Sequence, residues 1–282
     1  MHPFSQVDVF STEPLRGNPV AVVHLTDVPE GAVSDEQMAA FARWTNLSET
    51  TFVLPPTDPA ADYRLRIFTP GAELPFAGHP TLGSAHAWLE RGGLPRDPAV
   101  VVQECGAGLV RVHRDGGLLS FEAPPLVRSG PVEAADLGPV LAALGLAPDQ
   151  VVDAAWIDNG PGWLGVLVAD ADTVLALRPD HAALGQDVGV VGPREVAGAD
   201  GTACEVRAFC PPEQGIFEDP VTGSLNAGIG MWLAGTRLPA SYVAAQGTVL
   251  GRAGRVHVSS GPDGVRVGGA TRTVLSGTVS LA

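Results

Sequence analysis

The spacing of apolar and polar positions predicts short strands along the whole chain. Residues 4–10 alternate, residues 19–23 form an apolar run, and Gly17-Asn18 between them is a turn signal. Many short strands with few helices predict an α+β fold in which two curled sheets each wrap around one helix. The other expected strands are 51–54, 63–68, a second series from about Val151, Val249, 256–258, 265–267 and 274–279.

Two helices and one domain boundary are expected outside these strands. Ser34 with Gln37 forms a capping box that opens a helix to about Trp44, and a second helix is expected over 132–144. Connectors rich in proline and glycine occupy 55–62 and 124–131. The second connector divides the chain into domains 1–124 and 125–282, and the last strand is allowed to return to the first domain.

Two stretches of the chain read as copies of each other. The pentapeptide R-I-F-T-P at 66–70 recurs as R-A-F-C-P at 207–211, an offset of 141 residues that also aligns Phe76 with Phe217. An offset of 140 then aligns P-x-x-G-S-x-x-A at 80–87 with the same pattern at 220–227. This self-similarity indicates an internal duplication.

The repeated prolines suggest where the central helix of each half begins. Pro80 and Pro220 suit the first helical position, which makes His79 and Asp219 the N-caps, and Gly92 and Gly235 suit the helix ends. A helix start offers free N–H groups and a positive dipole end. We therefore expect both starts to line one cleft that binds a small anionic substrate.

Composition restricts the partners. The 282 residues carry a net charge of −14, which disfavours nucleic acids and anionic membranes. The sequence shows no signal peptide and no apolar run long enough for a membrane span. Three cysteines are too few for a disulfide framework, so a reduced cytoplasm is expected.

The absence of lysine excludes several chemistries. All 17 basic residues are arginine, so neither Schiff-base chemistry nor a P-loop is available. The sequence also shows no dinucleotide fingerprint, no G-x-S-x-G and no tight histidine cluster for a metal. We expect no cofactor and no metal, which leaves acid–base chemistry or simple binding.

Three side chains are candidates for acid–base chemistry. His79 is an unusual cap, whereas Asp219 is better explained, from spacing alone, as an ordinary N-cap. Glu49 lies where a helix ends and a strand begins, and glutamates in such turns are usually solvated. A carboxylate with an ordinary pKa of about 4.3 becomes a useful base near neutrality when burial or a neighbouring anion raises that pKa.

Several motifs closely resemble the PhzF family of phenazine biosynthesis proteins. They are Gly17-Asn18-Pro19, L-S-E-T-T-F-V at 47–53, F-T-P at 68–70, E-L-P-F-A-G-H-P-T at 73–81 and E-D-P-V-T-G-S at 218–224. The resemblance runs nearly end to end and implies the diaminopimelate epimerase-like fold, with two pseudo-symmetric halves that each wrap strands around a central helix. It also implies a cytoplasmic homodimer and cofactor-free isomerisation of trans-2,3-dihydro-3-hydroxyanthranilate.

The resemblance also implies roles for individual residues. Glu49 is similar to the family's proton-shuttling acid/base, with His79 and Asp219 beside it. The substrate-binding groups implied are Ser48, Gly78, Gly223 and Ser224. Leu225-Asn226 departs from the Ala-His that is common after Gly223-Ser224, which leaves the substrate open.

Other functions remain open at this point. Related epimerases use a cysteine at each central helix start, but this chain has none there, which disfavours thiol racemisation. An amino- or hydroxy-acid epimerase that uses Glu49 and Asp219 is the second enzyme hypothesis. A binding protein that has kept the fold is the third, because a fold does not determine function.

Overall fold

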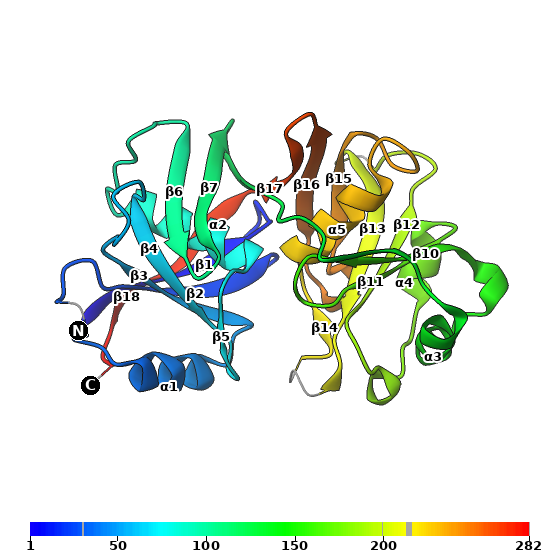
Figure 1. Cartoon of the computed structure of the whole chain (residues 1–282), viewed down its shortest axis with the longest axis horizontal. Helices are drawn as coiled ribbons and strands as arrows, with labels where there is room; N and C mark the ends of the chain where they lie inside the picture. The colour runs from blue at the N-terminus through cyan, green and yellow to red at the C-terminus, as the bar shows by residue number, and fades with distance from the viewer. Residues whose placement is uncertain (30, 199, 213–215, 282) are drawn as a thin grey trace. The chain divides into compact units, whose positions relative to one another are not determined.

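The structure is a computed structural model that describes residues 1–29, 31–198, 200–212 and 216–281. The chain forms two compact units (Figure 1): unit 1 holds residues 1–122 and 268–282, and unit 2 holds residues 123–267. The sequence placed this break two residues later, at 124/125. Residues 268–282 lie in unit 1 because the last strand pairs with the first.

The strands of unit 1 pair side by side in a single curved sheet. β1 lies between β18 and β2, and both of these neighbours are antiparallel to it. The order continues through β3 (parallel to β2), β4, β6 (parallel to β4) and β7 to β8. The strands are β1 (His2–Val9), β2 (Asn18–His24), β3 (Glu49–Leu54), β4 (Tyr63–Phe68), β5 (Glu73–Leu74), β6 (Val100–Cys105), β7 (Gly108–Asp115), β8 (Leu118–Glu122) and β18 (Thr271–Val279).

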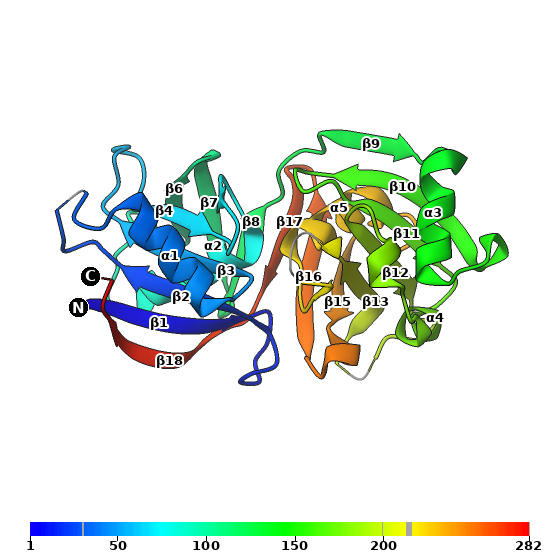
Figure 2. The ribbon, with the colours of Figure 1, turned by 90° about the horizontal axis from the view of Figure 1, so that it is seen from below.

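Helix α2 (Gly78–Glu90) occupies the interior of this sheet, where it packs against β1, β2, β18 and the strands that follow (Figures 1 and 2). Gly83 allows the closest approach, because a Cβ there would overlap the side chain of Val20 on β2. Helix α1 (Asp35–Thr45) covers the outer face, and its Met38 packs in an apolar cluster with Phe52 of β3. The sheet therefore separates two apolar layers.

Unit 2 repeats this plan strand by strand. β10 lies between β9 and β11, β12 is parallel to β11, and β13 is followed by a parallel β15 and an antiparallel β16. Its elements are β9 (Arg128–Pro131), α3 (Ala134–Leu144), β10 (Val151–Asp158), β11 (Leu164–Val168), α4 (Ala171–Ala176), β12 (Val188–Pro193), β13 (Thr202–Phe209), β14 (Glu218–Asp219), α5 (Gly223–Leu233), β15 (Ser241–Gln246), β16 (Gly254–Gly261) and the first part of β17 (Gly264–Gly269), with short 3-10 turns at Pro148–Gln150, His181–Ala183 and Thr248–Leu250.

The shared order of pairing confirms the duplication but corrects its register at the helices. Phe68 pairs with Glu73 in unit 1, and Phe209 pairs with Glu218 in unit 2. From each glutamate the chain runs five residues to the first residue of the central helix, Gly78 or Gly223. The true repeat is therefore E-x-P-x-x-G, and the predicted match between the patterns at 80–87 and 220–227 is wrong.

Phe76 and Phe217 are also not equivalent. Phe76 follows β5 and packs on Phe121, whereas Phe217 precedes β14 and packs on His181. In the corrected register Ser224 corresponds to His79, and Leu74 corresponds to Asp219. The loop between β13 and β14 is longer than its counterpart, which shifted the alignment made from the sequence.

Of the other local predictions, some are confirmed and two are wrong. The capping box of Ser34 and Gln37 and the left-handed glycines Gly92 and Gly235 after the central helices are confirmed. The connector 124–131 contains strand β9, and Val249 lies in a 3-10 turn, so those two predictions are wrong.

Candidate active site

Glu49 is the first residue of β3, directly after a tight helix-to-strand turn. α1 ends at Asn46 in the left-handed conformation (φ 51°), and the Thr45 and Thr50 hydroxyls lie 2.8 Å apart across the turn. Glu49 pairs with Val20 of β2, and its side chain is 15% exposed. The structure therefore holds this carboxylate within unit 1, whereas glutamates in such turns are usually solvated.

His79 approaches Glu49 from the start of α2. The His79 Nε2 and Glu49 Oε2 atoms are 3.3 Å apart, and the imidazole is 6% exposed. Burial lowers the pKa of His79 to about 3, although a hydrogen bond to the backbone of Pro19 partly opposes this shift. The ring is neutral at pH 7, so it lies close to the Glu49 carboxylate but brings no positive charge to it.

The Gly17-Asn18-Pro19 segment supports His79 from behind. Asp8 accepts hydrogen bonds from the backbone N–H groups of Arg16 and Gly17, and a Cβ at Gly17 would collide with the Val9 carbonyl. Asn18 is fully buried at the start of β2, with its amide nitrogen 3.5 Å from His79 Nδ1. This motif therefore orients the imidazole.

The two central helices begin differently from the prediction. The N-caps are Ala77 and Thr222, so His79 is the second residue of α2, and Asp219 lies in β14, four residues before α5. Pro80 is the third helical residue, and Pro220 precedes the helix. Proline tolerates any position in the first turn because those N–H groups lack helical partners.

Neither N-cap side chain accepts a hydrogen bond from its helix. The Ala77 side chain has no polar atom. The Thr222 hydroxyl donates to Asp219 Oδ2 instead, at 2.6 Å. An uncapped helix start presents N–H groups and a positive dipole end. Each unit thus has a helix start suited to an anion such as a carboxylate.

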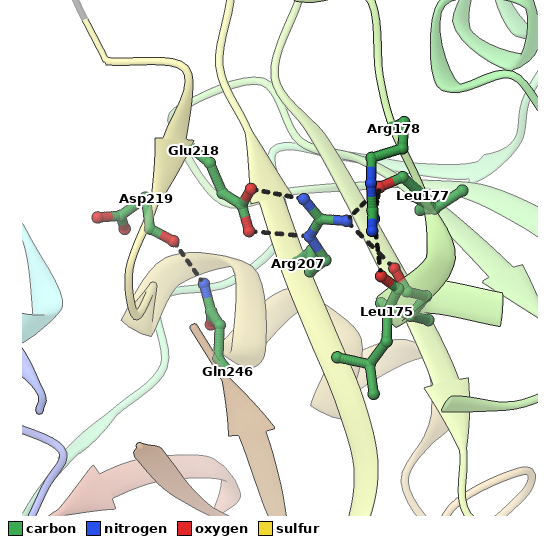
Figure 3. Close-up of polar contacts among 8 residues, drawn as sticks. Leu175, Leu177, Arg178, Arg207, Glu218, Asp219 and Gln246 are labelled. Atoms are coloured by element: carbon green, nitrogen blue, oxygen red, sulfur yellow. Dashed lines mark hydrogen bonds and ion pairs between the residues drawn. The ribbon is translucent and has the colours of Figure 1, made fainter. Parts of the chain in front are cut away.

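Asp219 is held by a buried polar network in unit 2. Gln246 of β15 donates from Nε2 to the Asp219 carbonyl (3.1 Å), an interaction shown in Figure 3, and to the Thr222 hydroxyl (2.9 Å). Its Oε1 accepts from the Thr222 backbone N–H (3.0 Å) and from the Asn226 amide (2.8 Å). Every polar hydrogen and the carbonyl oxygen of the Gln246 side chain are therefore in use.

The strand that carries Asp219 is fixed by an ion pair. Arg207 and Glu218 form a two-point contact at 2.9 and 2.7 Å, with the guanidinium facing the carboxylate (Figure 3). Arg207 also donates to the carbonyls of Val174 and Leu177, and both charged side chains are nearly fully buried. In unit 1, Arg66 and Glu73 make the equivalent pair, which is more exposed. Its Nε–Oε1 and Nη2–Oε2 distances are both 2.7 Å.

The remaining predicted residues lie next to these groups. Ser48 directly precedes Glu49, and Gly78 and Gly223 are the buried first residues of α2 and α5. Ser224 follows Gly223, and its hydroxyl oxygen accepts from the Trp163 indole N–H at 3.0 Å. Asn159 donates to the Ser224 carbonyl at 2.9 Å.

The structure thus brings Glu49, His79, Ser48 and Gly78 together in unit 1, and Asp219, Gly223 and Ser224 together in unit 2. Sequence reasoning noted Asn226 only as a departure from the family motif, and it did not assign supporting roles to Asn18, Trp163, Thr222 and Gln246. The corrected repeat would have drawn attention to Thr222, because it precedes the glycine of E-x-P-x-x-G.

Among the residues that the structure describes, no group of three or more histidine, cysteine or acidic side chains could hold a metal ion. Cys204 lies on β13, Cys210 directly follows this strand, and both are buried. Neither cysteine stands at the first residues of a central helix. In the same described residues, no helix has the length and apolarity needed to cross a membrane.

Comparison with known proteins places these features in a family. The family model described as "Phenazine biosynthesis-like protein" (PhzC-PhzF) matches residues 7–279. The chain belongs to the PhzC-PhzF family. The solved structure of a PhzF-family phenazine biosynthesis protein from Enterococcus faecalis is 25% identical and covers 98% of both chains, with a TM-score of 0.76. The fold is the diaminopimelate epimerase-like α+β fold that the resemblance implied.

Two relatives of this PhzC-PhzF member cover nearly all of the chain. "Antisense-enhancing sequence 1" of Schizosaccharomyces pombe is 40% identical and covers 98% of each protein. "Trans-2,3-dihydro-3-hydroxyanthranilate isomerase" of Pseudomonas aeruginosa is 37% identical, covering 95% of this chain and 93% of its own length. This chain is an isomerase of the family.

Proposed function

We propose that this chain isomerises trans-2,3-dihydro-3-hydroxyanthranilate, or a small cyclic carboxylic acid close to it, with Glu49 as the acid/base. The name of the Pseudomonas aeruginosa relative supports the substrate class. The single observation that carries the proton-transfer role is the Glu49–His79 pair, in which a mostly buried carboxylate lies 3.3 Å from a neutral imidazole.

The reaction needs only a proton carrier. Glu49 takes a proton from a carbon next to the unsaturated ring system and returns it elsewhere on the same face, so no atoms are gained or lost. His79 holds the carboxylate in place and exchanges a hydrogen bond with it as its protonation changes. No lysine is present to offer an alternative base.

The remaining site residues bind the substrate in this proposal. The uncapped starts of α2 and α5, with Gly78 and Gly223, are suited to a substrate carboxylate. Because Trp163 donates to the Ser224 oxygen, the Ser224 hydroxyl hydrogen points elsewhere and can bind a polar group of the substrate. Ser48 and Asp219 contact the substrate as further polar groups. A cytoplasmic homodimer stays a prediction of the family resemblance, and size-exclusion chromatography tests the dimer.

The test is turnover of trans-2,3-dihydro-3-hydroxyanthranilate by the wild-type protein and Glu49→Gln. We expect Glu49→Gln to fold normally and to lose at least about 100-fold in kcat, the scale of a general acid/base contribution. Glu36→Gln is the matched control, because that carboxylate is exposed on α1. Glu49→Gln turnover within a few-fold of wild type would remove Glu49 from the mechanism.

A further inference from the structure

The buried network around Asp219 carries an inference about residues outside the proposed catalytic set. Thr222 and Gln246 belong to different elements of unit 2, and both bond to Asp219. Asn226, one turn into α5, bonds to Gln246. Gln246 and Asn226 are fully buried and Thr222 nearly so, which keeps bulk water from competing for their hydrogen bonds.

The orientation of the Gln246 amide follows from its partners. Its Nε2 faces two oxygens, the Asp219 carbonyl and the Thr222 hydroxyl. Its Oε1 faces two donors, the Thr222 backbone N–H and the Asn226 amide nitrogen. Rotating the amide by half a turn would place acceptor against acceptor at the Asp219 carbonyl and donor against donor at the Thr222 N–H and the Asn226 amide, so only the observed orientation satisfies all four contacts.

This orientation determines where the Thr222 hydroxyl hydrogen points. The Thr222 oxygen accepts a hydrogen from Gln246, and a hydroxyl has a single hydrogen to donate. The Asp219 Oδ2 atom, 2.6 Å away, is its acceptor. A hydroxyl-to-carboxylate distance of that length is typical of a charge-assisted hydrogen bond.

We propose that Gln246, acting through Thr222, is a positioning residue that holds the Asp219 carboxylate in one orientation for the substrate, and that Asn226 holds Gln246. The inference rests on the proposed function, in which Asp219 contacts the substrate. It also accounts for Asn226, a departure from the common pattern of the family: its amide donates both to Gln246 and to the Thr222 carbonyl at 2.9 Å.

Charged and aromatic side chains also lie near Asp219 along the chain. Glu218, the preceding residue, is paired with Arg207 of β13, and the aliphatic part of Arg252 lies close to Gly247. His181 packs on the ring of Phe217. These side chains and the local charges stay the same in Thr222→Val and Thr222→Ser, so a difference between those two variants reports the Thr222 hydroxyl.

The experiment measures kcat/KM against pH for Thr222→Val, Thr222→Ser and Gln246→Glu. Thr222→Val keeps the shape but removes the donor, so we expect about a tenfold loss, the scale of a charge-assisted hydrogen bond. Because a hydrogen bond to the ionised form lowers the pKa of a carboxyl group, its loss moves the acid limb of the profile to higher pH. Thr222→Ser keeps the donor and should restore the wild-type profile.

Gln246→Glu tests the direction of the hydroxyl with Thr222 intact. A carboxylate oxygen in the place of Nε2 accepts the Thr222 hydrogen and turns it away from Asp219, and its negative charge disfavours a second carboxylate beside it. The acid limb should therefore move to higher pH by at least as much as in Thr222→Val. The control is Thr202→Val, which removes a threonine hydroxyl that donates to Asp200 at 2.9 Å in the same unit. We expect Thr202→Val to leave the pH profile unchanged.

The outcomes separate this inference from the proposed function. If Asp219→Asn loses activity but Thr222→Val and Gln246→Glu keep the wild-type pH profile, the positioning role is wrong and the proposed function stands. Loss of thermal stability without movement of the acid limb would mean that the network is only structural. If Asp219→Asn and Glu49→Gln both keep wild-type turnover, the proposed function itself is wrong.

Discussion

The two central helices begin at equivalent places in duplicated units, yet their surroundings differ. The start of α2 carries the buried His79–Glu49 pair, whereas the start of α5 carries Ser224 and a polar network that ends on Asp219. Cys105 of β6 occupies the place that Gln246 takes in β15. Duplication has therefore kept the backbone of the helix start and changed the side chains around it.

This difference suggests a division of labour within the proposed mechanism. In unit 1 the Glu49 carboxylate lies 3.3 Å from the neutral imidazole of His79 on α2, an arrangement that allows a proton to come and go. In unit 2 the carboxylate of Asp219 receives a directed hydroxyl from a buried polar network, an arrangement that favours a fixed ionised group. The first suits proton transfer and the second suits binding and orientation.

The ion pairs that anchor β5 and β14 differ in the same way, and breaking them gives the largest expected effect on stability. Arg207 and Glu218 are 4% and 7% exposed, whereas Arg66 and Glu73 are 23% and 42% exposed. Arg207→Met leaves the Glu218 carboxylate buried without its partner. We expect it to lower the free energy of unfolding by about 3–5 kcal/mol in urea titrations.

Arg66→Met is the matched variant in unit 1. Arg66 also pairs with Asp35, and water can solvate both Glu73 and Asp35 once the guanidinium is gone, so we expect a loss of about 1 kcal/mol or less. Equal losses for the two variants would show that the units use this repeated pair in the same way, contrary to the comparison.

A smaller effect concerns acid sensitivity, which we expect to arise mainly in unit 1. Burial lowers the pKa of His79 from 6.5 to about 3 and that of His24, on β2, to about 4. Between pH 6.5 and these values the unfolded chain binds protons that the folded chain refuses, so stability is present above pH 6.5 and falls as the pH drops. At pH 5 each histidine should cost about 2 kcal/mol relative to neutral pH.

The measurement is urea unfolding at pH 7 and pH 5 for the wild type, His24→Gln and His79→Gln. Each substitution should reduce the difference in unfolding free energy between the two pH values. An unchanged difference in both variants would contradict the burial of neutral imidazoles as the source of acid sensitivity.

Sequence reasoning predicted the elements better than the register between the halves. The α1 capping box and the boundaries of β4 follow from local signals, and both are observed. The predicted alignment of the two central helices rested on a chance match of P-x-x-G-S-x-x-A. It was wrong because the longer β13–β14 loop displaces the second copy of the repeat. Strand β9 was missed because its pairing with β10, and not its glycine- and proline-containing sequence, makes it a strand.

The candidate site shows the same limit. Glu49, His79 and Asp219 were found as residues with suitable chemistry at suggestive positions. The hydroxyl of Thr222 and the amide of Gln246 could not be connected to Asp219 from the sequence, because Gln246 lies 24 residues after Thr222. The two residues come together because β14, which carries Asp219, and β15, which carries Gln246, both pair with β13.

The most direct test of the account is a single-turnover reaction of trans-2,3-dihydro-3-hydroxyanthranilate in D₂O, with product labelling read by mass spectrometry and NMR. A proton carried by Glu49 exchanges with solvent while it resides on the carboxylate, so wild-type product should carry deuterium at the one carbon that gains the proton. Glu49→Gln should give no labelled product on the wild-type time scale. Labelled product from Glu49→Gln at the wild-type rate would show that another group moves the proton and would contradict the account.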